Sequence, residues 1–131
     1  MTVNGCFDGI TPGHLFLFGY ALAHGDALVV GLNSDEYIMR KKRPVPFYTE
    51  AQRVAMLRKF PFVHDVVVFR EDGPSDFIRR VRPVAHCIGD EYRGRAVEEP
   101  TCAELGVKLV FAPRLPAWSS SAARGATVVE P

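Results

Sequence analysis

Strand-like apolar runs alternate with helical patterns along the whole chain, and this alternation restricts the possible folds more than any other feature. Residues 27–32 (ALVVGL) form a continuous apolar run, which is typical of a strand covered on both faces of a parallel sheet. Thr49 with Gln52 three residues later forms a capping box ahead of the helical pattern at 50–60. The remaining strands are expected at 2–7, 63–69, 85–88 and 108–112, and the remaining helices at 15–22, 34–39, 74–81 and 97–105.

This order of elements predicts an α/β fold, a doubly wound parallel sheet of five strands with helices on both faces, as in Rossmann-like proteins. A chain of 131 residues holds one core, so residues 1–131 are expected to form a single domain that ends in a tail at 126–131. Ligands of such sheets bind beyond the carboxyl ends of the strands. The loops at that edge contain NGCFDGITPGH, a KKR segment, GDEYRGR and PRLPAWSSSAAR. The unusual residues therefore gather where a ligand is expected.

Charge and cysteine content argue against several classes of function. Sixteen basic and fifteen acidic side chains give a formal net charge of +1, so no overall field attracts nucleic acid. The three cysteines show no CxxC spacing, which argues against a disulfide framework or a zinc site. No signal-peptide pattern and no apolar run of membrane-spanning length occur. We therefore expect a cytoplasmic protein that binds neither membranes nor nucleic acid and holds no metal through its own side chains.

The glycine-rich stretch 4–15 (NGCFDGITPGHL) predicts an anion site without a metal. Neither GxxxxGK[ST] nor GxGxxG occurs, so a phosphate site here has to be built differently. Gly13 and His14 lie at a helix start, where unpaired N–H groups and the helix dipole favour an anion and an imidazole adds a donor. A lone histidine at this position more often makes a local hydrogen bond, so the neighbouring residues decide the interpretation.

Those neighbours resemble a known signature. With Gly5, Phe7, Asp8 and Thr11, the stretch is similar to the strand-end GxFD followed by [HT]xGH of the nucleotidylyltransferase superfamily, the relatives of class I aminoacyl-tRNA synthetases. Residues 114–124 (RLPAWSSSAAR) resemble its second signature, an Arg, a spacer and I-S-[ST]-[ST] at a helix start. VVGLNSDEY and IGDEYRG resemble its second- and fourth-strand segments, so the match covers about residues 3–125.

Within the superfamily, GDEYRG, the late PR and the chain length most resemble the small glycerol-3-phosphate cytidylyltransferase group. Heptose-phosphate adenylyltransferase domains come next and share NGCFD and the second-strand NSD. Both groups usually carry His where this chain has Thr11. The resemblance implies a cytidylyltransferase that transfers CMP from CTP to a small phosphate- or phosphonate-bearing acceptor and releases pyrophosphate. Two alternatives stay open: an ATP-dependent adenylyltransferase acting on a sugar phosphate or a pantetheine-like phosphate, and a non-catalytic nucleotide-binding sensor.

Nucleotidyl transfer is an in-line attack on the α-phosphorus, so the protein has to position two anions and stabilise the developing charge. By resemblance, His14, Thr11 and Lys41 would be the catalytic residues. Arg53 and Tyr92 would bind the acceptor. The nucleotide-binding residues implied by the resemblance are Gly5, Cys6, Phe7, Asp8, Gly13, Gly89, Asp90, Arg114, Ser119, Ser120 and Ser121.

A Mg²⁺ ion bound mainly through the nucleotide phosphates and a homodimer are also expected. A local hydrogen bond in the turn explains Asp8 equally well. His24, His64 and His86 have no acidic or cysteine companions at ligand spacing, and they are expected to be structural.

Overall fold

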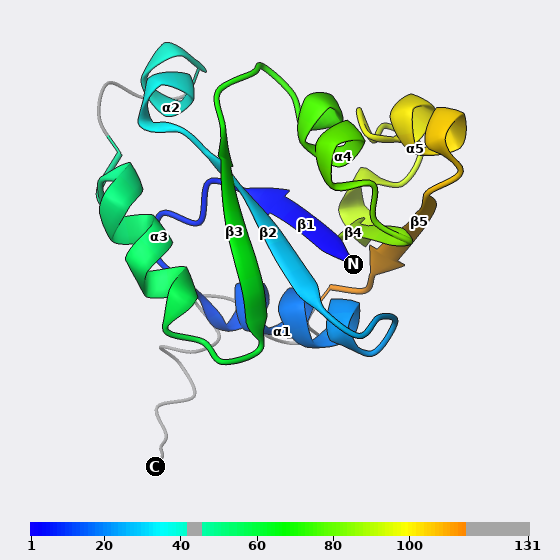
Figure 1. Cartoon of the computed structure of the whole chain (residues 1–131), viewed down its shortest axis with the longest axis horizontal. Coiled ribbons are helices and arrows are strands. Elements are labelled where there is room, and N and C mark those ends of the chain that lie inside the picture. Colours follow the sequence, from blue (N-terminus) through cyan, green and yellow to red (C-terminus); the bar gives the residue numbers. More distant parts are fainter. Residues whose placement is uncertain (42–45, 115–131) are drawn as a thin grey trace.

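The computed structural model describes residues 1–41 and 46–114, and their fold is the doubly wound α/β sheet expected from the sequence (Figure 1). Five parallel strands lie in the order β3-β2-β1-β4-β5. The strands are β1 (Thr2–Gly5), β2 (Leu28–Asn33), β3 (Val63–Phe69), β4 (Ala85–Gly89) and β5 (Lys108–Ala112). The helices are α1 (Pro12–Leu22), α2 (Asp35–Lys41), α3 (Glu50–Arg58), α4 (Ser75–Val81) and α5 (Glu99–Leu105), with a 3₁₀ turn η1 (Asp90–Tyr92).

Strand β1 is the central strand, and the direction of winding reverses beside it. It pairs with β2 over its whole length, with Val3 opposite Val30, and with β4 at Thr2 opposite His86. The chain moves outward from β1 to β2 and β3, then returns to β4 on the other side of β1. Such a reversal opens a crevice at the carboxyl ends of the strands, where ligands of this architecture bind.

Helices cover both faces of the sheet, and each face has its own core. Alternate residues of β3 divide between the two: Val66 and Val68 belong to one core, Val67 and Phe69 to the other. The first core includes Phe18 from α1 and Leu57 from α3, whereas the second is built with α4 and α5. This period of two confirms that the apolar run at 63–69 is a strand buried between two layers. Among the described residues, no helix is long and apolar enough to cross a membrane.

Two of the helices in the described part of the chain begin with a capping box. The predicted one at α3 is confirmed: the Thr49 hydroxyl accepts from the Gln52 N–H at 3.2 Å, and the Gln52 side chain accepts from the Thr49 N–H at 2.9 Å. The second opens α1, where Thr11 is the N-cap residue and Pro12 occupies the first helical position. A threonine before a proline is a recognised helix start, so α1 begins three residues earlier than the apolar pattern predicted.

Arg53, which was expected to bind the acceptor, is instead buried beneath the strand ends. Its side chain is fully inaccessible to solvent, and it lies outside the pocket described below. The guanidinium donates to the backbone carbonyls of Cys6 at 2.9 Å, Asn33 at 2.7 Å and Tyr48 at 3.2 Å. A fourth bond of 2.6 Å reaches the carboxylate of Asp35. Arg53 thus ties the ends of β1 and β2 to the starts of α2 and α3.

Candidate active site

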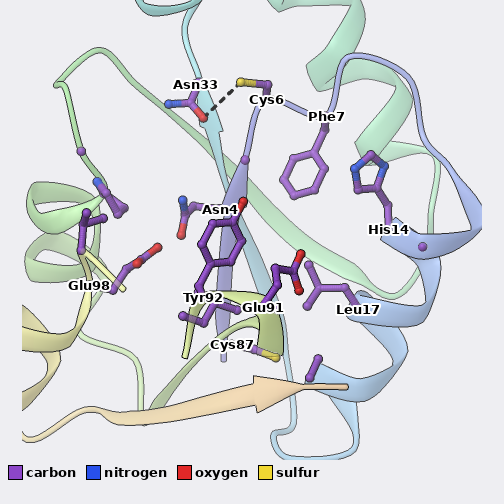
Figure 2. A pocket seen from close by; sticks show the side chains of 18 of the residues that line it. Asn4, Cys6, Phe7, His14, Leu17, Asn33, Cys87, Glu91, Tyr92 and Glu98 are labelled. Carbon is purple, nitrogen blue, oxygen red and sulfur yellow. Dashed lines mark hydrogen bonds between the residues drawn. The ribbon is translucent and has the colours of Figure 1, made fainter. Parts of the chain in front are cut away.

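A pocket of about 1240 Å³ lies at the carboxyl ends of all five strands (Figure 2). The last residue of every strand lines it: Gly5, Asn33, Phe69, Gly89 and Ala112. One wall is the start of α1, and the opposite wall is formed by the segments before α4 and α5. The pocket therefore occupies the crevice that the reversal of winding at β1 predicts.

His14 lines this pocket from the first turn of α1, beside the ring of Phe7 (Figure 2). Its Nδ1 accepts from the Thr11 N–H at 3.1 Å, while the Thr11 hydroxyl accepts from the His14 N–H at 3.2 Å. Because Nδ1 is an acceptor, the neutral ring carries its proton on Nε2. The capping box thus fixes the tautomer and keeps one N–H donor.

Partial burial lowers the pKa of His14 below 6.5, and a hydrogen bond with the backbone of Gly9 opposes part of this effect. Burial acts in this direction because it disfavours the charged imidazolium. Protonation would also place a hydrogen on Nδ1, which could then no longer accept from Thr11. His14 is therefore neutral at pH 7 and offers a donor rather than a charge.

We predict that kcat/KM falls as the pH is lowered, with a midpoint on the acid side of pH 6.5, because the neutral His14 is the prepared form. A lowered pKa moves the transition to the acid side of 6.5, the ordinary histidine value. The pH profile of kcat/KM and an NMR titration of the ring would measure it. A rate that rises as the pH falls through 6.5 would show that the imidazolium is the active form.

Phe7 lies in the turn between β1 and α1, Gly5 is the last residue of β1, and Gly13 lies in the first turn of α1. Phe7 has a φ of 45°, a left-handed backbone conformation that is costly for a bulky residue. Its ring lies over Gly5, where an added Cβ would approach the ring to 3.0 Å. Gly5 therefore makes room for Phe7 in this structure. At Gly13 an added Cβ would meet only Thr11 Oγ1, at 3.6 Å, so this glycine leaves open space at the pocket wall.

Lys41 does not line the pocket, but it pairs with a residue that does. As the last residue of α2, it places its Nζ 3.5 Å from a carboxylate oxygen of Asp72, which itself lines the pocket. Arg40 donates to the other carboxylate oxygen at 2.7 Å. The hydrogen bond from Arg40 and the charge of Lys41 lower the pKa of Asp72. The predicted phosphate-binding lysine is thus held next to the pocket by an exposed carboxylate.

The structure brings most of the expected site residues together and separates a few. Asp8 lies outside the pocket lining, and its carboxylate accepts from the N–H groups of Phe47 and Tyr48, at 2.7 Å each. Asp90 pairs with Arg93 at 2.8 Å and also lies outside. The expected residues that do line the pocket are Gly5, Cys6, Phe7, Thr11, Gly13, His14, Gly89, Tyr92 and Arg114. The predicted residues Ser119, Ser120 and Ser121 fall outside the described part of the chain.

Several polar residues of the pocket were not singled out by the sequence. Asn4 and Asn33 lie in β1 and β2, and a polar side chain near the end of an apolar strand is a signal that could have located them. Glu91, Arg95 and Glu98 come from the segment between β4 and α5. Nothing in the sequence separates Glu98 from its neighbour Glu99, because their difference in exposure depends on the fold.

Comparison with known proteins identifies the family. A family model described as cytidylyltransferase-like matches residues 2–124. The chain belongs to this family of nucleotidyltransferases. The superfamily expected from the two signatures is thereby confirmed. The finer resemblance to glycerol-3-phosphate cytidylyltransferases stays a prediction.

Curated relatives of the chain include bifunctional HldE proteins. The HldE protein of Acidiphilium cryptum is 39% identical over 121 residues, which are 91% of this chain and 25% of the relative. The HldE protein of Campylobacter jejuni is 41% identical over 95 residues, which are 72% of this chain and 21% of the relative. The chain thus spans about a quarter of the length of the curated relatives it matches.

A solved structure supports the fold. The crystal structure of the lipopolysaccharide core biosynthesis protein from Thermoplasma volcanium superposes with a TM-score of 0.74, at 21% sequence identity. The match covers 87% of this chain and 95% of that protein. At this identity the likeness bears on the fold, a Rossmann-like α/β sheet.

Proposed function

We propose that this domain transfers the adenylyl group of ATP to the phosphate of a small sugar phosphate and releases pyrophosphate. The observation that carries the proposal is His14, a neutral N–H donor held by a capping box at the start of α1 and lining the strand-end pocket. A helix start with an added donor binds phosphate groups, and here it belongs to a nucleotidyltransferase family.

In the proposed reaction, a phosphate oxygen of the acceptor attacks the α-phosphorus in line, and the bond from the α-phosphorus to the bridging oxygen of pyrophosphate breaks. The acceptor phosphate is already ionised, so no general base is needed. Because it attacks the nucleotide directly, no covalent enzyme intermediate is needed either. His14 exchanges its hydrogen bond with the Gly9 backbone for one from Nε2–H to the α- or β-phosphate. The Thr11 hydroxyl, whose oxygen accepts from His14, keeps its own hydrogen for a phosphate oxygen. Arg114 in the pocket lining and Lys41 beside Asp72 offset negative charge.

A magnesium ion would enter this pocket with the nucleotide. Mg²⁺ commonly binds through substrate phosphates, water and one or two carboxylates rather than a protein cage. Within residues 1–41 and 46–114, no group of three His, Cys, Asp or Glu side chains is arranged to hold a metal. The carboxylate of Glu91 lines the pocket and fits the commoner arrangement, whereas both oxygens of Asp72 are paired with Arg40 and Lys41. The ion would neutralise charge on the departing pyrophosphate.

Two observations favour ATP and a sugar phosphate over the CTP-dependent reaction. The curated relatives that match over most of this chain are HldE proteins. In addition, NGCFD and the second-strand NSD are the segments that the chain shares with heptose-phosphate adenylyltransferase domains. Transfer of CMP from CTP is the second candidate, because the family model is cytidylyltransferase-like.

A matrix of two nucleotides and several acceptors tests the choice. With ATP and CTP each offered to sugar 1-phosphates, glycerol 3-phosphate and pantetheine phosphate, we expect pyrophosphate release with ATP and a sugar 1-phosphate at rates at least about tenfold above any CTP reaction. The nucleotide product would be identified by mass spectrometry. Faster release with CTP and glycerol 3-phosphate would replace the proposal by the cytidylyltransferase reaction. Tight nucleotide binding without product from any acceptor would favour a sensor.

A further inference from the structure

A buried hydrogen-bonded histidine lies directly under the pocket. His86 of β4 is fully buried, and both of its ring nitrogens have partners on the neighbouring strand β1. Its Nδ1 lies 2.7 Å from the Thr2 hydroxyl, and its Nε2 lies 2.9 Å from Oδ1 of Asn4. Because an amide oxygen only accepts, Nε2 carries a proton, and in the neutral ring Nδ1 then accepts from the Thr2 hydroxyl. This expected structural histidine thus orients a side chain of the pocket.

The hydrogen bond with His86 fixes the orientation of the Asn4 side-chain amide. Its oxygen is occupied by His86, so the amide nitrogen, with two N–H donors, is the end left to a ligand. Asn4 lines the pocket at its floor, one residue before the strand end. A side chain whose orientation is set by a buried neighbour loses little entropy when it binds a ligand.

The side chain of Glu98, which precedes α5, also lies close to Nε2 of His86. The residue is 7% exposed and lines the pocket, and its carboxylate lies 3.8 Å from Nε2 of His86, beyond hydrogen-bond distance. Asn4 and Glu98 therefore flank a single ring nitrogen, and Figure 2 shows the carboxylate pointing toward Asn4. A carboxylate with so little contact with solvent is costly unless hydrogen-bond donors reach it.

We propose that Asn4 and Glu98 form a subsite for adjacent hydroxyl groups of a sugar ring. A hydroxyl both donates and accepts, so it can donate to the carboxylate of Glu98 while a neighbouring hydroxyl accepts from the amide of Asn4. Phosphate groups do not fit this place, because the carboxylate repels them. The inference rests on the proposed function, whose substrates supply two such sugars: the ribose of the nucleotide and the sugar of the acceptor.

The conservative variant Glu98→Gln, compared with Glu99→Gln, tests the subsite. Glu99 is the adjacent residue, is exposed and lies outside the pocket lining. Glu99→Gln therefore removes the same charge as Glu98→Gln without altering the pocket. In the ribose arm, calorimetry measures binding of ATP, 2′-deoxy-ATP and 3′-deoxy-ATP. In the acceptor arm, it measures binding of glucose 1-phosphate and mannose 1-phosphate against inorganic phosphate, with a non-hydrolysable ATP analogue present.

We expect Glu98→Gln to weaken the ligand that carries the bound hydroxyls by about tenfold, because a charge-assisted hydrogen bond becomes a neutral one. If the ribose is bound, the preference for ATP over a deoxy nucleotide disappears in this variant. If the acceptor sugar is bound, the preference for a sugar phosphate over inorganic phosphate disappears instead. Glu99→Gln should leave both preferences intact.

Asn4→Asp provides an independent variant. It keeps the oxygen that accepts from His86 and replaces the two N–H donors by an acceptor, so the same preference should be lost. If neither arm changes in either variant while thermal unfolding stays cooperative, the subsite is wrong, even where pyrophosphate release is normal. Conversely, absence of turnover with every acceptor would contradict the proposed reaction. The binding of ATP and its deoxy analogues would still test whether Asn4 and Glu98 form the subsite.

Discussion

Replacing Arg53 by alanine is expected to lower the free energy of unfolding by about 3–5 kcal/mol, because a buried guanidinium that donates to backbone carbonyls and to the partly exposed Asp35 is lost. The substitution removes the hydrogen bonds that Arg53 donates to the carbonyls of Cys6 and Asn33, and its ion pair with Asp35. It also leaves a cavity where a fully buried side chain packed. Since whole domains are stable by only about 5–15 kcal/mol, the variant should lose a large share of its stability. Chemical denaturation at 15 °C would measure the loss.

Arg58 provides a matched control on the same helix. Its guanidinium pairs with Asp65 at 3.3 Å, and both side chains are more than half exposed. Screening by solvent makes such a pair worth at most about 1 kcal/mol, so Arg58→Ala should unfold nearly as the wild type does. Arg53→Lys should still lose much of the stability. The single ammonium of lysine lacks the planar fork of donors with which the guanidinium reaches two carbonyls and a carboxylate at once. Equal stabilities of the two alanine variants would contradict the role of Arg53 as the tie between strand ends.

The sheet could be predicted because the signal for each strand is contained in the strand itself. The Val-rich run 63–69 and the run 108–112 coincide with β3 and β5, since each buries alternate side chains on two faces. The start of α5 could not be placed this way. Val97 looks helical by pattern, yet it is exposed and precedes the helix, which begins at Glu99.

The site could be predicted only where its residues are adjacent in sequence. His14 and Thr11 were found together, because a capping box and a glycine-rich turn are local features. The burial of Arg53 depends on three segments that meet only after folding. From the sequence alone, Arg53 is therefore predicted to bind the acceptor. The orientation of Asn4 also depends on the fold, because it is set by a histidine 82 residues away.

Replacing His14 by alanine should lower kcat by about a hundredfold or more, because a donor aimed at charge that develops in the transition state is lost. The KM for ATP should change far less, since the other pocket residues still bind the nucleotide in its ground state. The fold should survive: the Thr11 hydroxyl caps the backbone N–H of residue 14, which alanine retains. The lost bonds are the exposed one from the Thr11 N–H to Nδ1 and the one between the His14 ring and the Gly9 backbone. Steady-state rates of pyrophosphate release and a thermal unfolding curve would separate the two effects.

His24→Ala is the matched control, because His24 lies just beyond the other end of α1. It is exposed, makes a 2.9 Å contact with the backbone oxygen of Tyr20 and lies outside this pocket. Its loss should change kcat by less than about twofold, since a solvated donor far from the phosphates stabilises no transition-state charge. A His14→Ala enzyme with near-normal kcat would remove His14 from the reaction. The helix start would then bind phosphate through its backbone alone, and His14 would serve only to cap it.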